Sequence, residues 1–137
     1  MRKLNPKTRQ AIAAKEDELV QKAREVAKAL WETLSEKQQK DGKVRQLRNI
    51  LEVAESTDSW KALALFIRYQ AARGELNIGW AEKVIETLDD LENEARKLAQ
   101  DNKDDPKAVH LEMITRLLGH AVRWHLWDVK SQEVSHV

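Results

Sequence analysis

The sequence predicts an all-α protein that forms a single-domain bundle of about five helices. Only four glycines and two prolines interrupt its 137 residues, and the residues that favour helices, such as Ala, Leu, Glu, Lys and Gln, are common. Apolar residues recur with helical spacing along most of the chain. A chain of this length usually forms one domain. We therefore expect one domain over residues 1–137, with 131–137 as a flexible tail.

The first helix is expected to begin near Asn5, because Pro6 then takes the first helical position, where its missing N–H has no cost. This helix frays into the polar residues 35–40, and Asp41–Gly42 marks a break. The residues predicted to face inward are Ile12, Leu19, Ala23, Val26, Leu30 and Leu34.

A second, shorter helix follows the break, and its inner face carries Val44, Leu47, Leu51 and Ala54. The polar cluster 56–59 suits the N-cap of a third helix. That helix runs from Trp60 to Gly74, where a glycine can adopt the left-handed conformation that ends helices.

A fourth helix is predicted to begin around Asn77, with its acidic side chains mostly facing water. The last helix opens at Pro106, after the capping residues Asp104 and Asp105, and ends at about Asp128. The inward residues of the fourth helix are Ala81, Val84, Ile85, Leu88, Leu91, Ala95 and Leu98.

The charges are unevenly distributed along the chain, although the formal net charge is only +1. Residues 1–38 contain nine Lys and Arg against six Asp and Glu, and residues 39–74 contain seven against four, so each segment carries +3. Residues 75–105 contain four against ten and carry −6. Such a chain can present a basic surface to a polyanion, although well-solvated helices would show the same pattern.

Several functional classes are disfavoured by the sequence. The absence of cysteine excludes disulfides and thiolate chemistry and fits a reducing compartment, so we expect the cytoplasm. No stretch reaches the roughly 18 apolar residues of a membrane span, and no glycine-rich phosphate loop or hydrolase motif occurs. His110, His120, His125 and His136 lack the spacing of a metal site. We expect no enzyme, no cofactor, no metal and no membrane partner.

Basic residues of the second and third helices are candidates for contact with a nucleic-acid backbone. Arg45 and Arg48 are three positions apart and flank the apolar stripe, so both guanidinium groups can reach the same side and form a phosphate fork. Lys61 and Arg68 share a face of the third helix, whereas Arg73 turns towards Tyr69. Pairing with nearby glutamates would instead make these ordinary surface residues.

In the last helix, Arg116, His120, Arg123 and Trp127 fall on one arc, away from the apolar arc of that helix. This stripe could meet a phosphate backbone or another protein. For the five tryptophans, Trp31, Trp60, Trp80, Trp124 and Trp127, we favour packing over base stacking.

The run VRQLRN and the Tyr-x-x-x-Arg run from Tyr69 to Arg73 resemble motifs of a known family. Residues 40–74 resemble the small helical subunit of Csm-type (type III-A) CRISPR interference complexes, and ITRLLGHAVRWH in the last helix resembles a closing segment of that family more weakly. The resemblance implies a non-catalytic subunit of a ribonucleoprotein. It would stack with copies of itself and line the channel of guide and target RNA beside other complex subunits.

Under this resemblance Arg45, Arg48 and Arg73 match motif positions, and helix geometry adds the remaining cations of the predicted RNA-binding set. These additions are Lys61, Arg68, Arg116 and Arg123. The small subunit of Cmr-type complexes is an alternative with the same task. A second alternative is a protein-protein adaptor without nucleic acid, which would use the acidic helix with Trp124 and Trp127 as its contact surface.

Overall fold

A computed structural model describes residues 2–41 and 44–135 of the chain, and this part is helical without strands. The all-α prediction is confirmed, but the helices are shorter and more numerous than the predicted five or so. The helices are α1 (Pro6–Ala13), α2 (Glu16–Thr33), α3 (Glu36–Asp41), α4 (Val44–Ser56), α5 (Trp60–Ala72), α6 (Ile78–Asp89), α7 (Glu92–Asn102) and α8 (Pro106–Ser135).

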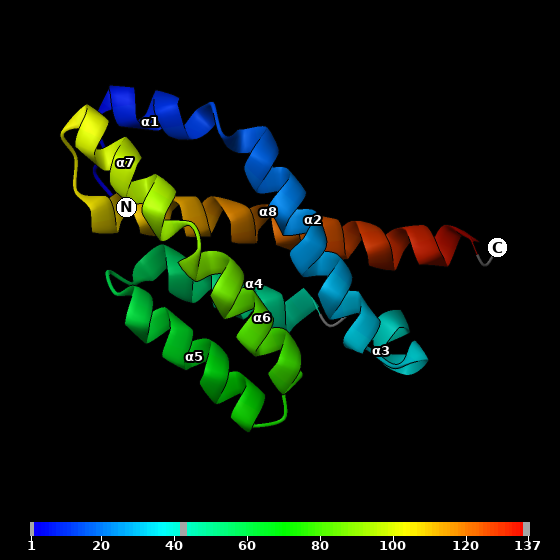
Figure 1. Cartoon of the computed structure of the whole chain (residues 1–137). Coiled ribbons are helices and arrows are strands. Elements are labelled where there is room, and N and C mark those ends of the chain that lie inside the picture. Colours follow the sequence, from blue (N-terminus) through cyan, green and yellow to red (C-terminus); the bar gives the residue numbers. More distant parts are fainter. Residues whose placement is uncertain (1, 42–43, 136–137) are drawn as a thin grey trace.

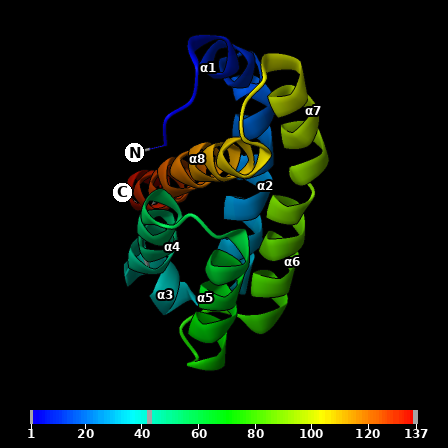
Figure 2. The ribbon, with the colours of Figure 1, turned by 90° about the vertical axis from the view of Figure 1, so that its left-hand side faces the viewer.

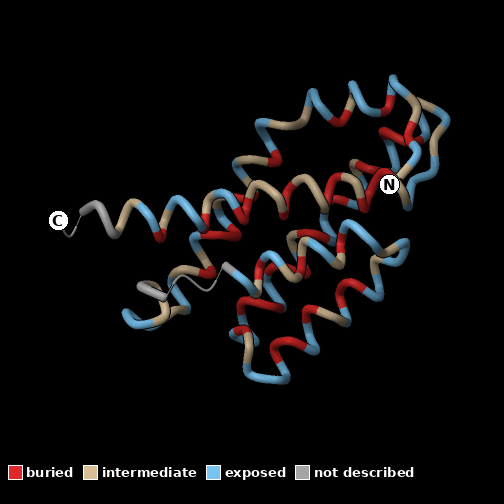
Figure 3. Tube along the Cα trace, turned by 180° about the vertical axis from the view of Figure 1, so that it is seen from behind, coloured by how far each residue is buried: buried red, intermediate tan, exposed pale blue. Residues whose placement is uncertain are grey.

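The long helix α8 forms the axis of the bundle, and α2, α4 and α7 pack directly against it. The helices α5 and α6 form a hairpin that lies below α8 in Figure 1 and runs nearly vertically in Figure 2. Figure 3 shows buried and exposed residues alternating along each helix, as expected for amphipathic helices with one face on a shared core. Fully buried side chains at the centre of this core include Leu47, Leu63, Ile67, Leu88, Met113, Leu117 and Leu118.

The predicted helix ends are confirmed at most of the capping residues. Asn5 and Asn77 cap α1 and α6, because their side chains accept the N–H groups of Thr8 and Trp80. Ser59 caps α5 in the same way, and Gly74 after α5 has a φ of 81°. A left-handed φ of this kind favours glycine, which has no Cβ to clash.

Two predicted helices are each divided by a bend without glycine or proline. The first bends between α1 and α2, and the fourth bends between α6 and α7. The two bends are joined by an ion pair of 3.1 Å between Lys15 Nζ and Glu94 Oε1, and α1 packs against α7. The helix pairs α1–α2 and α6–α7 thus lie against each other near their bends, and the Lys15–Glu94 pair is a partly exposed contact there.

The polar run 35–40, predicted to fray, is mostly the short helix α3. The Ser35 hydroxyl accepts the N–H of Gln38 at 3.2 Å, and the Gln38 side chain accepts the N–H of Ser35 at 2.9 Å. This reciprocal pair is a capping box, which stabilises a helix start. The predicted break at Asp41–Gly42 lies at the edge of the described residues, because Gly42 is outside them.

The last helix extends to Ser135 and so passes the predicted end at Asp128. The segment predicted to be a flexible tail thus begins within α8, and its last two residues are outside the described part. Among the described residues, no helix has the combined length and apolar character needed to span a bilayer.

Candidate nucleic-acid interface

The first two turns of α4 carry an exposed pair of arginines. Arg45 and Arg48 lie on the outer face of α4 together with Glu52 and Glu55, whereas Leu47 on the opposite face is fully buried. Within the described part of the chain, neither arginine has an ion-pair partner. The glutamates that could have neutralised them are located further along the helix, so the N-terminal half of this face is cationic.

Arg45 and Arg48 add to the partial positive charge that the N-terminus of α4 already carries. A helix N-terminus carries a partial positive charge, so stability favours acidic residues in the first turn. The first turn of α4 contains no acidic residue, and Arg45 and Arg48 add two formal charges close to it. The sum of helix dipole and guanidinium groups favours an anion at this end of α4.

The start of α4 lies close to the loop that follows α5. Gln46 Nε2 donates a hydrogen bond of 2.8 Å to Glu75 Oε2, so Glu75 is occupied by an amide and not by an arginine. A hollow of about 220 Å³ beneath this contact is lined by residues of α2, α3, α4 and the α5–α6 loop. The predicted residue Arg73 is two positions before Glu75 and therefore belongs to the same end of the α4–α5 pair.

Arg73 packs against an exposed aromatic ring. Its guanidinium carbon lies 5.5 Å from the centre of the Tyr69 ring, and Tyr69 is 54% exposed. An arginine held over an aromatic face keeps its donors available at the ring edge. Tyr69 and Arg73 can therefore offer one stacking surface and one phosphate contact to a single strand.

The other predicted cations of α5 differ in their surroundings. Arg68 Nε is 3.0 Å from Glu82 Oε1 of α6, and both side chains are about half exposed, so this pair is a surface salt bridge. Lys61 is exposed in the first turn of α5 without an ion-pair partner among the described residues. It lies at the far end of α5 from Arg73, so α5 alone does not bring these cations together.

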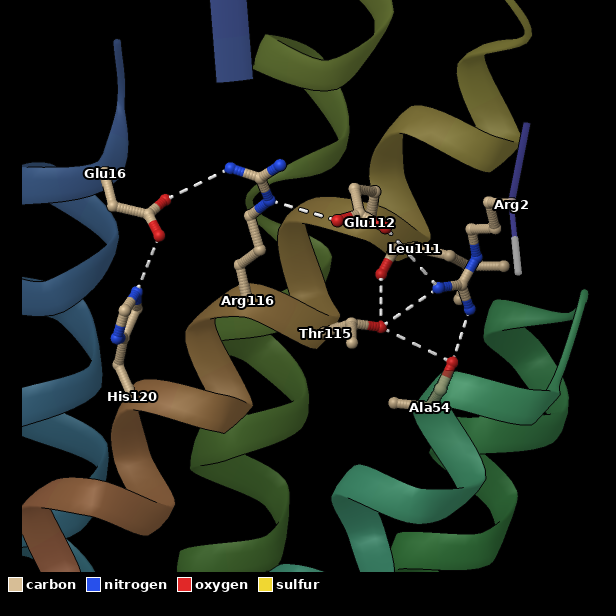
Figure 4. A network of polar contacts seen from close by, with 8 residues as sticks. All are labelled: Arg2, Glu16, Ala54, Leu111, Glu112, Thr115, Arg116 and His120. Atoms are coloured by element: carbon tan, nitrogen blue, oxygen red, sulfur yellow. Dashed lines mark hydrogen bonds and ion pairs between the residues drawn. The ribbon is translucent and has the colours of Figure 1, made fainter. Parts of the chain in front are cut away.

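Arg116 of α8 is part of an ion network and is largely neutralised (Figure 4). Its Nε lies 3.0 Å from Glu112 Oε2, and its Nη1 lies 3.5 Å from Glu16 Oε2. Glu16 also accepts His120 Nε2 at 3.0 Å, while Arg123 Nη1 is 3.2 Å from His120 Nδ1. The predicted arc of α8 therefore exists, but its inner members connect α8 to the start of α2.

Arg123 and Trp127 form the outer part of that arc. Arg123 is exposed, and Trp127 is 62% exposed. The other four tryptophans are packed into the bundle: the indole N–H groups of Trp80 and Trp124 donate to the carbonyls of Val26 and Val20. The preference for packing over stacking holds for these rings, and Trp127 remains available for contact.

Arg2 is a polar residue that sequence reasoning missed. Its side chain is 9% exposed, and its guanidinium group donates to the carbonyl of Ala54 and to Thr115 Oγ1 (Figure 4). It also donates to the carbonyl of Thr57. It closes the C-terminal end of α4 and fixes the first residues of the chain against α8. A basic residue near a chain start carries no sequence signal for this role.

The part of the chain that the structure describes contains no cluster of three metal-ligating side chains, and His136 lies outside that part. His125 is fully buried beside Trp31, with ring centres 6.2 Å apart, and neither of its nitrogens has a hydrogen-bond partner. Burial lowers the pKa of His125 below 6.5, and the Asp128 carboxylate opposes this only in part. The ring is therefore held neutral in the core.

Neither protein-family models nor curated proteins nor solved structures give a match to this chain.

Proposed function

We propose that this chain is a non-catalytic small subunit of a type III CRISPR ribonucleoprotein, which lines the channel of guide and target RNA with basic backbone contacts. The proposal combines the motif resemblance of residues 40–74 with one structural observation. Arg45 and Arg48 are exposed at the positive end of α4 and are not neutralised by any described acidic residue. A helix N-terminus favours negative charge, so an anionic partner would stabilise this end of α4.

The proposed contact is electrostatic and independent of base sequence. Arginine binds phosphate oxygens in a bidentate manner, which positions a strand without reading its bases. Arg73 with Tyr69 extends the same surface by one cation and one ring, while Lys61, Arg68 and Arg123 supply further exposed charge. Arg116 is the least suited of the predicted residues, because two carboxylates already bind it.

The test is the salt dependence of single-stranded RNA binding by the full chain. Replacing both arginines, Arg45→Ala with Arg48→Ala, should weaken binding and lower the slope of log K against log salt by about 1.4, since each phosphate contact contributes about 0.7. The melting temperature should change by no more than a few degrees, because both side chains are exposed.

A matched control is the pair Lys7→Ala with Arg9→Ala in α1. Both residues are exposed, and the substitution removes the same two charges from another surface. This control should leave the salt slope nearly unchanged. Equal losses in the two double variants would show that only net charge matters, and the assignment to α4 would then be wrong.

A second candidate function is a protein-protein adaptor without nucleic acid. It is favoured by the exposed apolar side chains Leu65, Tyr69 and Ile78 of the α5–α6 hairpin, of which Leu65 is 67% and Ile78 is 66% exposed. Large apolar side chains at a surface often mark protein contacts. An adaptor would bind its partner with little dependence on salt, which distinguishes it from the RNA-binding subunit.

A further inference from the structure

A cavity of about 630 Å³ opens where the start of α5, the junction of α6 and α7, and the start of α8 meet. These three places lie together at one end of the bundle (Figure 1). The floor consists of the Trp60 ring, the His110 ring and Leu111, of which His110 and Leu111 are buried. A concave site of this volume with an apolar floor has the usual properties of a pocket for a small organic molecule.

His110 presents an unused hydrogen-bond acceptor at this floor. Its Nε2 lies 2.9 Å from the carbonyl oxygen of Leu88, and a carbonyl can only accept, so Nε2 carries the proton. In the neutral ring Nδ1 is then a bare acceptor, and it has no donor among the described residues. His110 is only 4% exposed. Because His110 lines the cavity and its Nδ1 is not among the enclosed, unpaired side-chain atoms of the described residues, a ligand that donates an N–H or O–H group can reach this nitrogen.

The orientation of the His110 ring is fixed by its neighbours. Trp60 packs against it edge to face, with ring centres 5.6 Å apart and planes at 66°. The Trp60 N–H donates to Asp89 Oδ1 at 2.9 Å, which holds the indole in place. The acceptor and the aromatic wall are therefore positioned before any ligand arrives, which lowers the entropy lost on binding.

The rim of the cavity contains lysines with free charges. Lys61 and Lys107 line the opening, and neither has an ion-pair partner in the described chain. Arg96 on the same rim is bound to Glu92 at 2.7 Å, and the carboxylates of Asp58 and Asp89 complete it. The lysines belong to the first turns of α5 and α8, where the helix dipoles also favour negative charge.

We propose that this cavity binds a small organic anion of the nucleoside monophosphate class. The base lies against Trp60 and donates an N–H group to His110 Nδ1, and the phosphate group lies between Lys61 and Lys107. The site shares Lys61 with the predicted RNA-binding residues but does not include Arg45, Arg48 or Arg73, so it goes beyond the proposed RNA-backbone function and can exist without it.

The first test is a calorimetric titration of the full chain with adenosine 5′-monophosphate at low salt. We expect saturable binding, with adenosine and ribose 5-phosphate each about tenfold weaker or more, because each lacks one of the two recognised groups. The ¹⁵N signals of the His110 ring should shift on addition of the nucleotide. The absence of saturable binding at millimolar nucleotide would overturn the proposal.

Substitutions then locate the site. Lys107→Ala should weaken nucleotide binding about tenfold, whereas Lys97→Ala, which removes an exposed lysine of α7 outside the cavity lining, should leave it unchanged. His110→Gln should weaken the nucleotide but not ribose 5-phosphate. If His110→Gln does not fold, the comparison of Lys107→Ala with Lys97→Ala is the test. Equal nucleotide affinities of these two variants would place the nucleotide elsewhere and overturn the assignment.

Discussion

His125 shows how one buried residue links stability to pH. Its ring is fully buried on α8 and packs against Trp31 of α2, and the Asp128 carboxylate only partly offsets the lowering of its pKa by burial. Because the pKa of His125 is below 6.5 in the folded chain, the unfolded chain binds the proton first as the pH falls. The contribution of neutral His125 to stability is therefore fully present above pH 6.5 and is lost below it.

We predict that His125→Leu makes the protein less sensitive to acid between pH 7 and pH 5.5. In the wild type, His125 should lower the free energy of unfolding by up to about 1.4 kcal/mol for each unit by which the pH falls in that range. Leucine cannot take up a proton and needs no hydrogen bond. Urea denaturation at several pH values measures the effect, and parallel curves for both proteins would contradict it.

The sequence predicted which side chains of the candidate interface are exposed, but it did not predict which of them form ion pairs. The spacing of Arg45 and Arg48 against Leu47 predicted an exposed pair beside a buried stripe, and the structure has that arrangement. Arg116 pairs with Glu112 four positions earlier, which local spacing allows, and also with Glu16, one hundred positions away in the sequence. Local spacing contains no information on such a contact, because it arises only when α2 packs on α8.

At the scale of helices, Arg2 joins α4 to α8 through the carbonyls of Ala54 and Thr57 and the hydroxyl of Thr115. We predict that Arg2→Ala lowers the free energy of unfolding by about 2–4 kcal/mol, because buried acceptors lose a charged donor. Chemical denaturation measures this loss. Lys3→Ala, at an exposed neighbouring position, should change the free energy of unfolding by less than about 0.5 kcal/mol. An equally small effect of Arg2→Ala would show that the hydrogen bonds of Arg2 do not stabilise the fold.

Helix ends were predictable where one residue has a local chemical role. Asn5, Ser59 and Asn77 cap helices through bonds to residues three positions later, and Gly74 ends α5 in the left-handed region. The capping box at Ser35 was not predicted, because the polar composition of the segment argued against a helix. The two bends were not readable, because the Lys15–Glu94 contact that joins them is a tertiary one.

At the scale of the whole molecule, α8 forms the centre of the core, and the basic and acidic segments adjoin along the α5–α6 contact, where Arg68 pairs with Glu82. The acidic residues after position 75 belong mainly to α6 and α7, and the candidate interface belongs to α4 and α5. In the proposed function, the cationic start of α4 would face an RNA strand and the acidic residues of α6 and α7 would be turned away from it, which would orient the chain on a polyanion. Several aligned copies would increase the affinity further, since linked weak contacts act together.

The most direct test of the account is to purify the tagged chain from its own cells, sequence the RNA that accompanies it and identify the accompanying proteins. We predict short RNAs with a common repeat-derived end, together with several larger subunits. The Arg45→Ala, Arg48→Ala variant should retain less of this RNA, and its own level should be unchanged. A single protein partner without enriched RNA would contradict the ribonucleoprotein account and support the adaptor.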